Sequence, residues 1–213
     1  MITDLLVQQI ESCLPYEPNR EQSELLQQLA AFVLDGRDDS LFLLRGYAGT
    51  GKTSLVGALV KALTQLQSKV VLLAPTGRAA KVFSRYARHP AYTIHRRIYR
   101  QKSYSPDMEG FLIGENLAKH TLFIVDEASM IANSVGEGAL DDLVEYVYSG
   151  EHCRLILLGD TAQLLPVGQE RSPALDAAVM GGYGLNVVEY ELREVARQAA
   201  ESGILYNATR LRE

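Results

Sequence analysis

Short apolar runs alternate with longer stretches of helical spacing along most of the chain. Five runs have the length and the Leu, Ile and Val content of buried strands, and they are residues 41–44, 70–74, 122–125, 155–158 and 187–190. Apolar residues recur at helical spacing in segments at about 19–34, 52–66, 78–86, 138–148 and 173–179. This alternation predicts an α/β fold in which a parallel sheet is covered by helices on both faces.

The segment 100–116 interrupts this alternation. It is polar, contains Pro106 and Gly110, and separates two strand-compatible stretches, 99–103 and 111–113. These features predict a small hairpin, inserted at about 99–118, that projects from the sheet. An ordinary surface loop is the alternative.

Residues 46–53 read Gly-Tyr-Ala-Gly-Thr-Gly-Lys-Thr and lie between the first strand-like run and a helical segment. Glycines let such a loop bend so that its N–H groups, and the positive end of the following helix, point at phosphates. Lys52 is expected to reach the β- and γ-phosphates, and the Thr53 hydroxyl to hold magnesium. The predicted nucleotide contacts in this segment are Gly46, Ala48, Gly49, Thr50, Gly51, Lys52, Thr53 and Ser54.

Two adjacent carboxylates, Asp126 and Glu127, follow the strand-like run 122–125. Asp126 is placed to hold the magnesium ion, and Glu127 to orient and deprotonate an attacking water. This pairing favours hydrolysis over transfer to another substrate. The alternative is an Asp-Glu pair that only serves the dipole of a helix N-terminus.

The composition is typical of a soluble globular protein, with 213 residues of which 47% are hydrophobic. No apolar run approaches the roughly 18 residues that a membrane span needs, and the first ten residues include Asp4 but no basic residue. The two cysteines, Cys13 and Cys153, fit neither a disulfide framework nor a zinc spacing, so we expect buried thiols. We expect a soluble, cytoplasmic protein with no membrane partner.

The charges are unevenly distributed, although the net charge is −5. Residues 40–106 contain no Asp or Glu but hold 12 of the 21 Lys and Arg. An acid-free segment of this length indicates a surface kept positive for a polyanion. Four tyrosines lie among these cations, where they suit stacking on unpaired bases, and they are Tyr86, Tyr92, Tyr99 and Tyr104. The alternative is that the tyrosines belong to the core and the arginines are merely solvated.

Together these motifs resemble the first motor domain of a superfamily 1B DNA helicase of the RecD and Dda type. Six segments beside the phosphate loop match the family's Q, Ia, Ib, II, III and IV motifs, and in chain order they are residues 18–22, 74–81, 93–96, 125–130, 159–164 and 192–198. The resemblance covers about residues 18–200. It implies a RecA-like P-loop NTPase fold that binds ATP with Mg²⁺.

The resemblance also implies roles for three polar side chains around the nucleotide. Gln22 would read the adenine edge, Gln163 would contact the γ-phosphate, and Arg197 would add positive charge there. For each of them a simpler alternative remains open. Gln22 could be a helix-capping side chain, Gln163 part of a polar turn, and Arg197 a solvated arginine.

A single-strand path is implied along motifs Ia and Ib. Its expected residues are Pro75, Thr76, Arg78, Thr93, His95 and Arg96. Thr76 could equally be a helix cap, and His95 a structural histidine. By the same resemblance, the hairpin at 99–118 would be the pin that splits a duplex.

The function expected from these motifs is that of an ATP- and Mg²⁺-dependent, 5′ to 3′ DNA helicase motor. It would bind single-stranded DNA and single-strand/double-strand junctions, and we expect a monomer. Residues 1–213 would be the first RecA-like domain, with the second motor domain absent and ATP hydrolysis therefore weak. Two alternatives remain open: a P-loop phosphotransferase, and a nucleotide-gated single-strand-binding module that hardly turns over.

Overall fold

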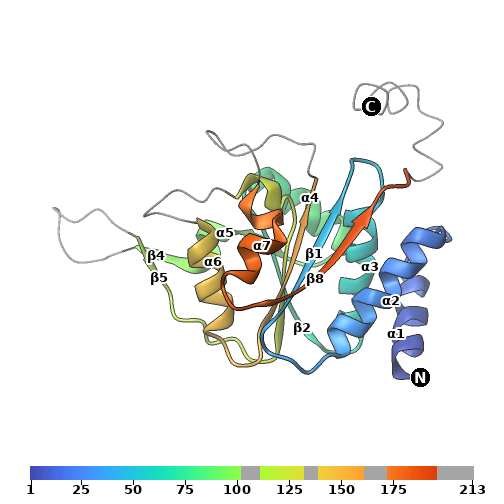
Figure 1. Cartoon of the computed structure of the whole chain (residues 1–213), viewed down its shortest axis with the longest axis horizontal. Helices are drawn as coiled ribbons and strands as arrows, with labels where there is room; N and C mark the ends of the chain where they lie inside the picture. Colours follow the sequence, from blue (N-terminus) through green and yellow to red (C-terminus); the bar gives the residue numbers. More distant parts are fainter. Residues whose placement is uncertain (102–110, 132–138, 161–171, 196–213) are drawn as a thin grey trace.

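The computed structural model describes residues 1–101, 111–131, 139–160 and 172–195 (Figure 1). Within this part, a six-stranded sheet has the order β3-β2-β6-β7-β1-β8, and each neighbouring pair is parallel. Its strands are β1 (Ser40–Gly46), β2 (Lys69–Ala74), β3 (Ala91–Thr93), β6 (Thr121–Val125), β7 (Arg154–Gly159) and β8 (Asn186–Leu192). The five predicted strands and the parallel sheet are confirmed. The three-residue β3 is too short to give a hydrophobic pattern.

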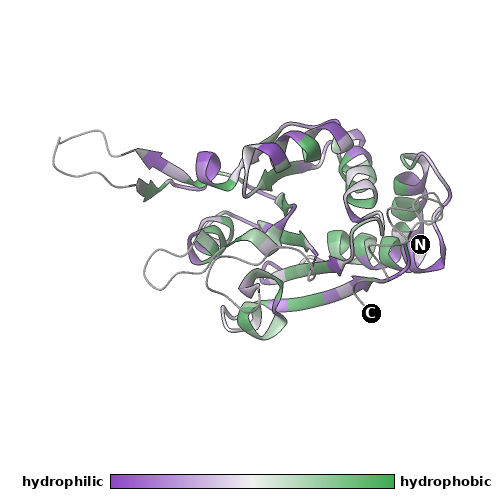
Figure 2. Ribbon diagram, turned by 90° about the horizontal axis from the view of Figure 1, so that it is seen from above, coloured by the Kyte–Doolittle hydropathy of each residue, from purple (hydrophilic) through white to green (hydrophobic). Residues whose placement is uncertain are grey.

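Helices cover both faces of the sheet, as predicted. One face carries α1 (Ile2–Ser12), α2 (Arg20–Leu34), α3 (Lys52–Gln65) and α4 (Gly77–Ala87). The other face carries α5 (Ile94–Ile98), α6 (Ala139–Tyr148), α7 (Ala177–Gly181) and the 3₁₀ turns η1 (Ala128–Met130) and η2 (Pro173–Leu175). In the view from above, apolar residues concentrate along the strands between these two helical layers (Figure 2).

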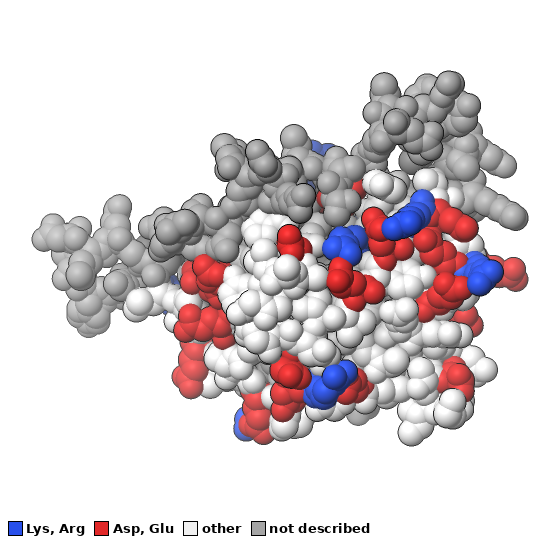
Figure 3. Space-filling model, viewed as in Figure 1, with Lys and Arg blue, Asp and Glu red and all other residues white. Residues whose placement is uncertain are grey.

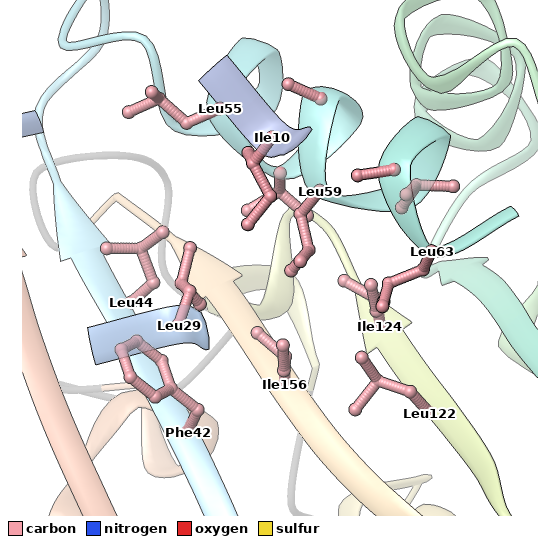
Figure 4. Close-up of a cluster of buried hydrophobic side chains, with 14 of the residues drawn as sticks. Ile10, Leu29, Phe42, Leu44, Leu55, Leu59, Leu63, Leu122, Ile124 and Ile156 are labelled. Atoms are coloured by element: carbon pink, nitrogen blue, oxygen red, sulfur yellow. The ribbon is translucent and has the colours of Figure 1, made fainter. Parts of the chain in front are cut away.

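Alternation along the strands builds a separate core on each face. In β1, Phe42 and Leu44 pack with α2 and α3, whereas Leu41 and Leu43 face α6. Figure 4 shows the first of these cores, where Ile10 of α1 meets Leu59 of α3 above the strands. The helix α1 was not predicted, and it buries only Leu6 and Ile10 against this core.

The predicted helix at 173–179 is wrong as a single element, because it divides at Asp176 into η2 and α7. Asp176 has an extended backbone, and its carboxylate accepts the N–H groups of Ala178 at 2.8 Å and Val179 at 3.3 Å. A side chain that caps the backbone in this way starts a new helix and ends the previous turn.

A separate two-stranded sheet is formed by β4 (Tyr99–Gln101) and β5 (Phe111–Ile113), which pair in antiparallel fashion. The two strands extend away from the central sheet (Figure 1). These two strands lie within the predicted stretches 99–103 and 111–113, whereas 102–110, including Tyr104, lie outside the described residues.

Both cysteines are free thiols; Cys153 is buried and Cys13 is only partly buried. Among the helices that the structure describes, none combines the length and the apolar character needed to cross a membrane.

Candidate nucleotide-binding site

The candidate site lies at the carboxyl ends of three adjacent strands. The strands β6, β7 and β1 are neighbours in the sheet and end at Val125, Gly159 and Gly46. Because parallel strands end at one edge, the segments that follow them meet there. This places the phosphate loop beside Asp126, Glu127 and Asp160.

Backbone geometry explains the glycines of the phosphate loop. Gly49 and Gly51 have φ of 85° and 93°, a region that other residues rarely adopt. Gly51 is also the N-cap of α3. A Cβ on Gly46 would lie 2.7 Å from the Leu192 carbonyl oxygen, so a side chain there would collide with β8. The loop can therefore hold this shape only with glycine at these positions.

The Lys52 ammonium is folded back over the loop. Its Nζ donates to the carbonyl oxygens of Gly46 at 2.5 Å and Tyr47 at 2.9 Å. Lys52 is the first residue of α3, where the helix dipole favours an anion. The Lys52 ammonium thus lies over the loop, where the oxygens of a bound phosphate could accept its hydrogen bonds in place of the Gly46 and Tyr47 carbonyls.

Thr53 and Asp126 form the candidate magnesium site. The Thr53 hydroxyl donates to Asp126 Oδ2 at 3.1 Å, and the Glu127 N–H donates to Asp126 Oδ1 at 2.9 Å. Asp126 is only 7% exposed. Burial raises the pKa of Asp126, and the hydrogen bonds from Glu127 and Thr53 together with the charge of Lys52 partly oppose that rise. A buried carboxylate beside a hydroxyl is an oxygen donor set that suits Mg²⁺.

Glu127 is set apart from Asp126 by its backbone. It has φ of 57°, which is unusual for a residue with a side chain and is characteristic of functional sites. Burial raises the pKa of Glu127, and the neighbouring charge of Asp126 raises it further. A carboxylate with a raised pKa is a stronger base than an exposed glutamate, which agrees with the water-activating role expected for Glu127.

Gln22 makes both kinds of contact that the sequence left open. It completes the capping box of α2, with its N–H donating to Asn19 Oδ1 and its Oε1 accepting from the Asn19 N–H. Its Nε2 also donates to the Thr50 carbonyl oxygen at 3.0 Å, and the side chain is 2% exposed. The capping alternative is therefore observed, and the same amide supports the phosphate loop.

Two further residues at this site, Tyr16 and Glu21, were not among the predicted site residues, although Glu21 lies within the matched segment 18–22. The buried Tyr16 hydroxyl has no hydrogen-bond partner among the described residues, and it would lie 3.2 Å from a Cβ on Gly51. Burial raises the pKa of Tyr16. The Glu21 carboxylate accepts the N–H groups of Arg193 and Glu194, which joins α2 to the chain after β8. Gln163 and Arg197 lie outside the described residues.

The buried carboxylate of Asp126 is expected to lower the stability of the protein at neutral pH. Because the pKa of Asp126 is raised in the folded protein, the free energy of unfolding without nucleotide should fall as the pH rises through that pKa and the side chain ionises. We expect Asp126→Asn to raise the melting temperature at neutral pH, with a difference from wild type that shrinks toward acidic pH. Each kcal/mol gained would shift the midpoint by about 2–4 °C, which thermal scanning resolves.

The exposed Asp39 provides the matched control for this comparison. Asp39→Asn removes an exposed carboxylate and should leave the melting temperature at neutral pH close to that of wild type. An Asp126→Asn protein that melts below wild type at pH 7 would show that the buried carboxylate is stabilising without a cation.

The expected single-strand path begins at the ends of β2 and β3, on the same edge of the sheet. Ala74 and Thr93 are paired in register, and Thr76 and Thr93 each cap the helix that follows, with N–H to Oγ1 distances of 3.2 Å. The capping alternative for Thr76 is thus observed. Thr93 does the same for α5. These caps turn the first residues of α4 and α5 toward the edge that holds the phosphate loop.

Three candidate strand-binding side chains, Arg78, His95 and Arg96, are exposed, whereas Pro75 and Thr76 are half-buried. Arg96 lies over the Tyr92 ring at 5.8 Å, and His95 contacts the Tyr99 ring at 4.7 Å.

The described tyrosines of the acid-free segment differ in exposure, which distinguishes residues that are available for stacking on bases from residues that belong to the core. Tyr86 and Tyr92 are 52% and 39% exposed. Tyr99 is half-buried, and its hydroxyl donates to Asp142 Oδ2 at 2.5 Å. On the face that carries α6, α7 and β8, the charged side chains are more often acidic than basic (Figure 3).

Residues 17–213 match the family model described as an AAA domain. The chain is 33% identical over 191 residues to the ATP-dependent RecD2 DNA helicase of Deinococcus radiodurans, across 89% of this chain and 23% of that protein. It is 30% identical over 165 residues to the ATP-dependent DNA helicase dda of Enterobacteria phage T4, across 74% of this chain and 35% of that protein. The chain therefore spans about a quarter to a third of the length of these two relatives.

A solved structure shares the fold. The Pif1 helicase from Candida albicans superposes with a TM-score of 0.58 at 20% identity, across 93% of this chain and 44% of that chain. At this level of identity the likeness concerns the fold, and it agrees with the six-stranded parallel sheet between two helical layers described above.

Proposed function

Because the chain belongs to the AAA domain family, and within it to the superfamily 1B helicase motor domains of the RecD and Dda type, we propose that it binds ATP with Mg²⁺ and couples hydrolysis to movement along single-stranded DNA. The observation that carries this proposal is the 3.1 Å contact between Thr53 and Asp126. It brings the phosphate loop and the strand-end carboxylates, 73 residues apart in the sequence, into one site.

Each residue of the site has a distinct task in this proposal. Lys52 binds the β- and γ-phosphates, and Thr53 with Asp126 holds the magnesium ion, which supplies charge neutralisation during phosphoryl transfer. Glu127 accepts a proton from the attacking water. Gln163 and Arg197 are proposed to act at the γ-phosphate, on the strength of the family resemblance alone.

The proposed DNA path rests on charge and position. Arg78 and Arg96 are exposed at the starts of α4 and α5, on the sheet edge where the ATP site lies. They belong to the segment 40–106, which has no acidic residue. Nucleotide binding and strand binding would thus use the same edge of the sheet, at the ends of different strands, and β2 of the strand path is the direct neighbour of β6 at the nucleotide site.

Charge reversal tests this path. We expect Arg78→Glu and Arg96→Glu each to weaken binding of a single-stranded oligonucleotide and to reduce the salt slope by about 0.7 per lost phosphate contact. Fluorescence anisotropy over a range of salt concentrations measures both quantities, and ATP affinity should be unchanged.

Lys69→Glu is the matched control, because Lys69 is an exposed cation of the same acid-free segment at the opposite, amino-terminal end of β2. It should bind the strand with the wild-type slope. Unchanged strand binding in both arginine variants would show that Arg78 and Arg96 are solvated surface residues that do not bind the strand. Conversion of ATP to ADP that depends on an added phosphate acceptor, with the phosphoryl group found on that acceptor and no response to a single strand, would favour a phosphotransferase instead.

We propose that Gln22 also reads adenine. Gln22→Ala should then narrow the difference between ATP and GTP affinities, because the remaining contacts are to phosphate. Asn19→Ala is the control, since it removes the side-chain cap and costs about 1 kcal/mol of stability but keeps the Gln22 amide. An equal loss of ATP and GTP affinity in Gln22→Ala would show that Gln22 supports the phosphate loop and caps α2 but does not read adenine.

The hairpin of β4 and β5 is proposed to meet the single-strand/double-strand junction, because it projects from the sheet next to α5.

Translocation needs two DNA-binding surfaces that move relative to each other. We therefore propose that unwinding requires a second motor domain in a full-length, monomeric protein. Residues 1–213 tested by themselves should hydrolyse ATP slowly.

A further inference from the structure

Two histidines and a glutamate meet at the end of the sheet opposite the phosphate loop. His120 precedes β6, and Glu151 and His152 precede β7, two neighbouring strands. One ligand atom from each of the three side chains lies within 4.8 Å of the others. The imidazole rings of His120 and His152 are stacked, with centroids 4.6 Å apart and an angle of 13°. We propose that this cluster binds a transition-metal ion of the Zn²⁺ class.

The backbone holds the cluster together before any ion binds. The His120 N–H donates to the Glu151 carbonyl oxygen at 2.8 Å, and Lys119 and Glu151 form a parallel bridge. His120 and His152 have φ of 50° and 52°, a region that side-chain-bearing residues enter at a cost and that recurs at ligand sites. Both imidazoles are thereby fixed on the same surface.

The surrounding groups prepare these ligands for a metal. His152 Nδ1 lies 2.8 Å from Asp38 Oδ1. When this nitrogen donates to the carboxylate, Nε2 keeps its lone pair, as in most metal-binding histidines. Lys119 pairs with Oε2 of Glu151, which leaves Oε1 for an ion. Zinc bonds of about 2.0–2.1 Å require ligand atoms about 3.3 Å apart, so these exposed side chains must converge slightly.

The donor set identifies the class of ion. Two imidazole nitrogens and one carboxylate oxygen suit Zn²⁺ or a similar transition metal, whereas Mg²⁺ selects oxygen donors. A water molecule would complete the tetrahedron. The cluster lies beside a surface cavity of about 320 Å³, lined by both histidines, Asp38 and Arg154, through which an ion can enter. The ion would fasten the starts of β6 and β7, far from the nucleotide site.

Calorimetric titration of the nucleotide-free protein with Zn²⁺ tests the proposal. We expect one ion per chain with micromolar affinity, and a rise of about 5 °C in melting temperature because the folded state binds the ion preferentially. His120→Ala and His152→Ala should each weaken binding at least tenfold. Asp38→Asn should weaken it about tenfold by releasing the His152 ring.

Two controls separate this cluster from other metal ligands. His89→Ala removes a histidine between α4 and β3, and Asp126→Asn alters the magnesium site. Both should bind Zn²⁺ as wild type does. Zinc binding that survives in the double variant of His120 and His152, or that Mg²⁺ reproduces with equal affinity, would overturn the proposal.

Discussion

Replacement of Lys52 by alanine is expected to weaken ATP binding by a factor of about thirty to several thousand. Removing one partner of a desolvated charge pair costs about 2–5 kcal/mol, and each 1.4 kcal/mol is a factor of ten. In the loop, the Lys52 ammonium already lies over the Gly46 and Tyr47 carbonyl oxygens, at the start of α3. No other lysine or arginine belongs to the loop 46–53, so nothing there replaces its charge.

Calorimetric titration with a non-hydrolysable ATP analogue measures this loss. Lys61→Ala is the matched control, because Lys61 lies on the same helix about 13 Å further along its axis and should bind the analogue normally. The melting temperature of Lys52→Ala shows whether the variant is folded. If a folded Lys52→Ala protein binds the ATP analogue with an affinity within threefold of wild type, Lys52 does not bind the phosphates.

The sequence predicted those parts of the molecule whose signals are local. The phosphate loop depends on glycines at fixed spacing, and the structure shows why, since Gly51 needs positive φ and Gly46 abuts Leu192. The strands β1, β6 and β7 are continuous apolar runs because they are buried on both faces. Their parallel order then brings Asp126 to Thr53, which the pattern of alternating elements implied.

Features that depend on contacts between distant residues could not be predicted. The hydrogen bond from Gln22 to the Thr50 carbonyl joins residues 28 positions apart, and no spacing rule indicates it. The His120 and His152 rings meet only because β6 and β7 are neighbours. A motif search cannot find such a cluster, although each histidine is visible in the sequence.

Local competition explains the remaining differences. Asp176 lies inside a segment of helical pattern, and only the fold decides that its carboxylate caps α7 rather than facing solvent within one long helix. Thr76 and Gln22 could each be a cap or a ligand-binding residue, and both are caps in the structure. A capping contact uses only part of the hydrogen-bonding capacity of each side chain, and the second role of Gln22 is the subject of the nucleotide-binding test above.

Glu127→Gln is expected to bind ATP within a few-fold of wild type and to hydrolyse it about a hundredfold to ten-thousandfold more slowly, the range that general-base catalysis contributes. Glutamine has the same shape and tolerates φ of 57° no worse than glutamate, so the backbone should not change. Burial and the charge of Asp126 raise the pKa of Glu127, which makes its carboxylate a better base but also protonates it at a higher pH.

The pH dependence separates loss of a base from loss of a merely structural contact. A protonated Glu127 cannot accept a proton, so wild-type turnover should fall as the pH drops through the raised pKa, and the residual turnover of Glu127→Gln should lack this limb. Steady-state phosphate release at several pH values measures both proteins, with Glu145→Gln on the exposed side of α6 as the control that keeps the wild-type profile. Wild-type turnover in Glu127→Gln, or an acid limb that persists in it, would assign proton transfer to another group.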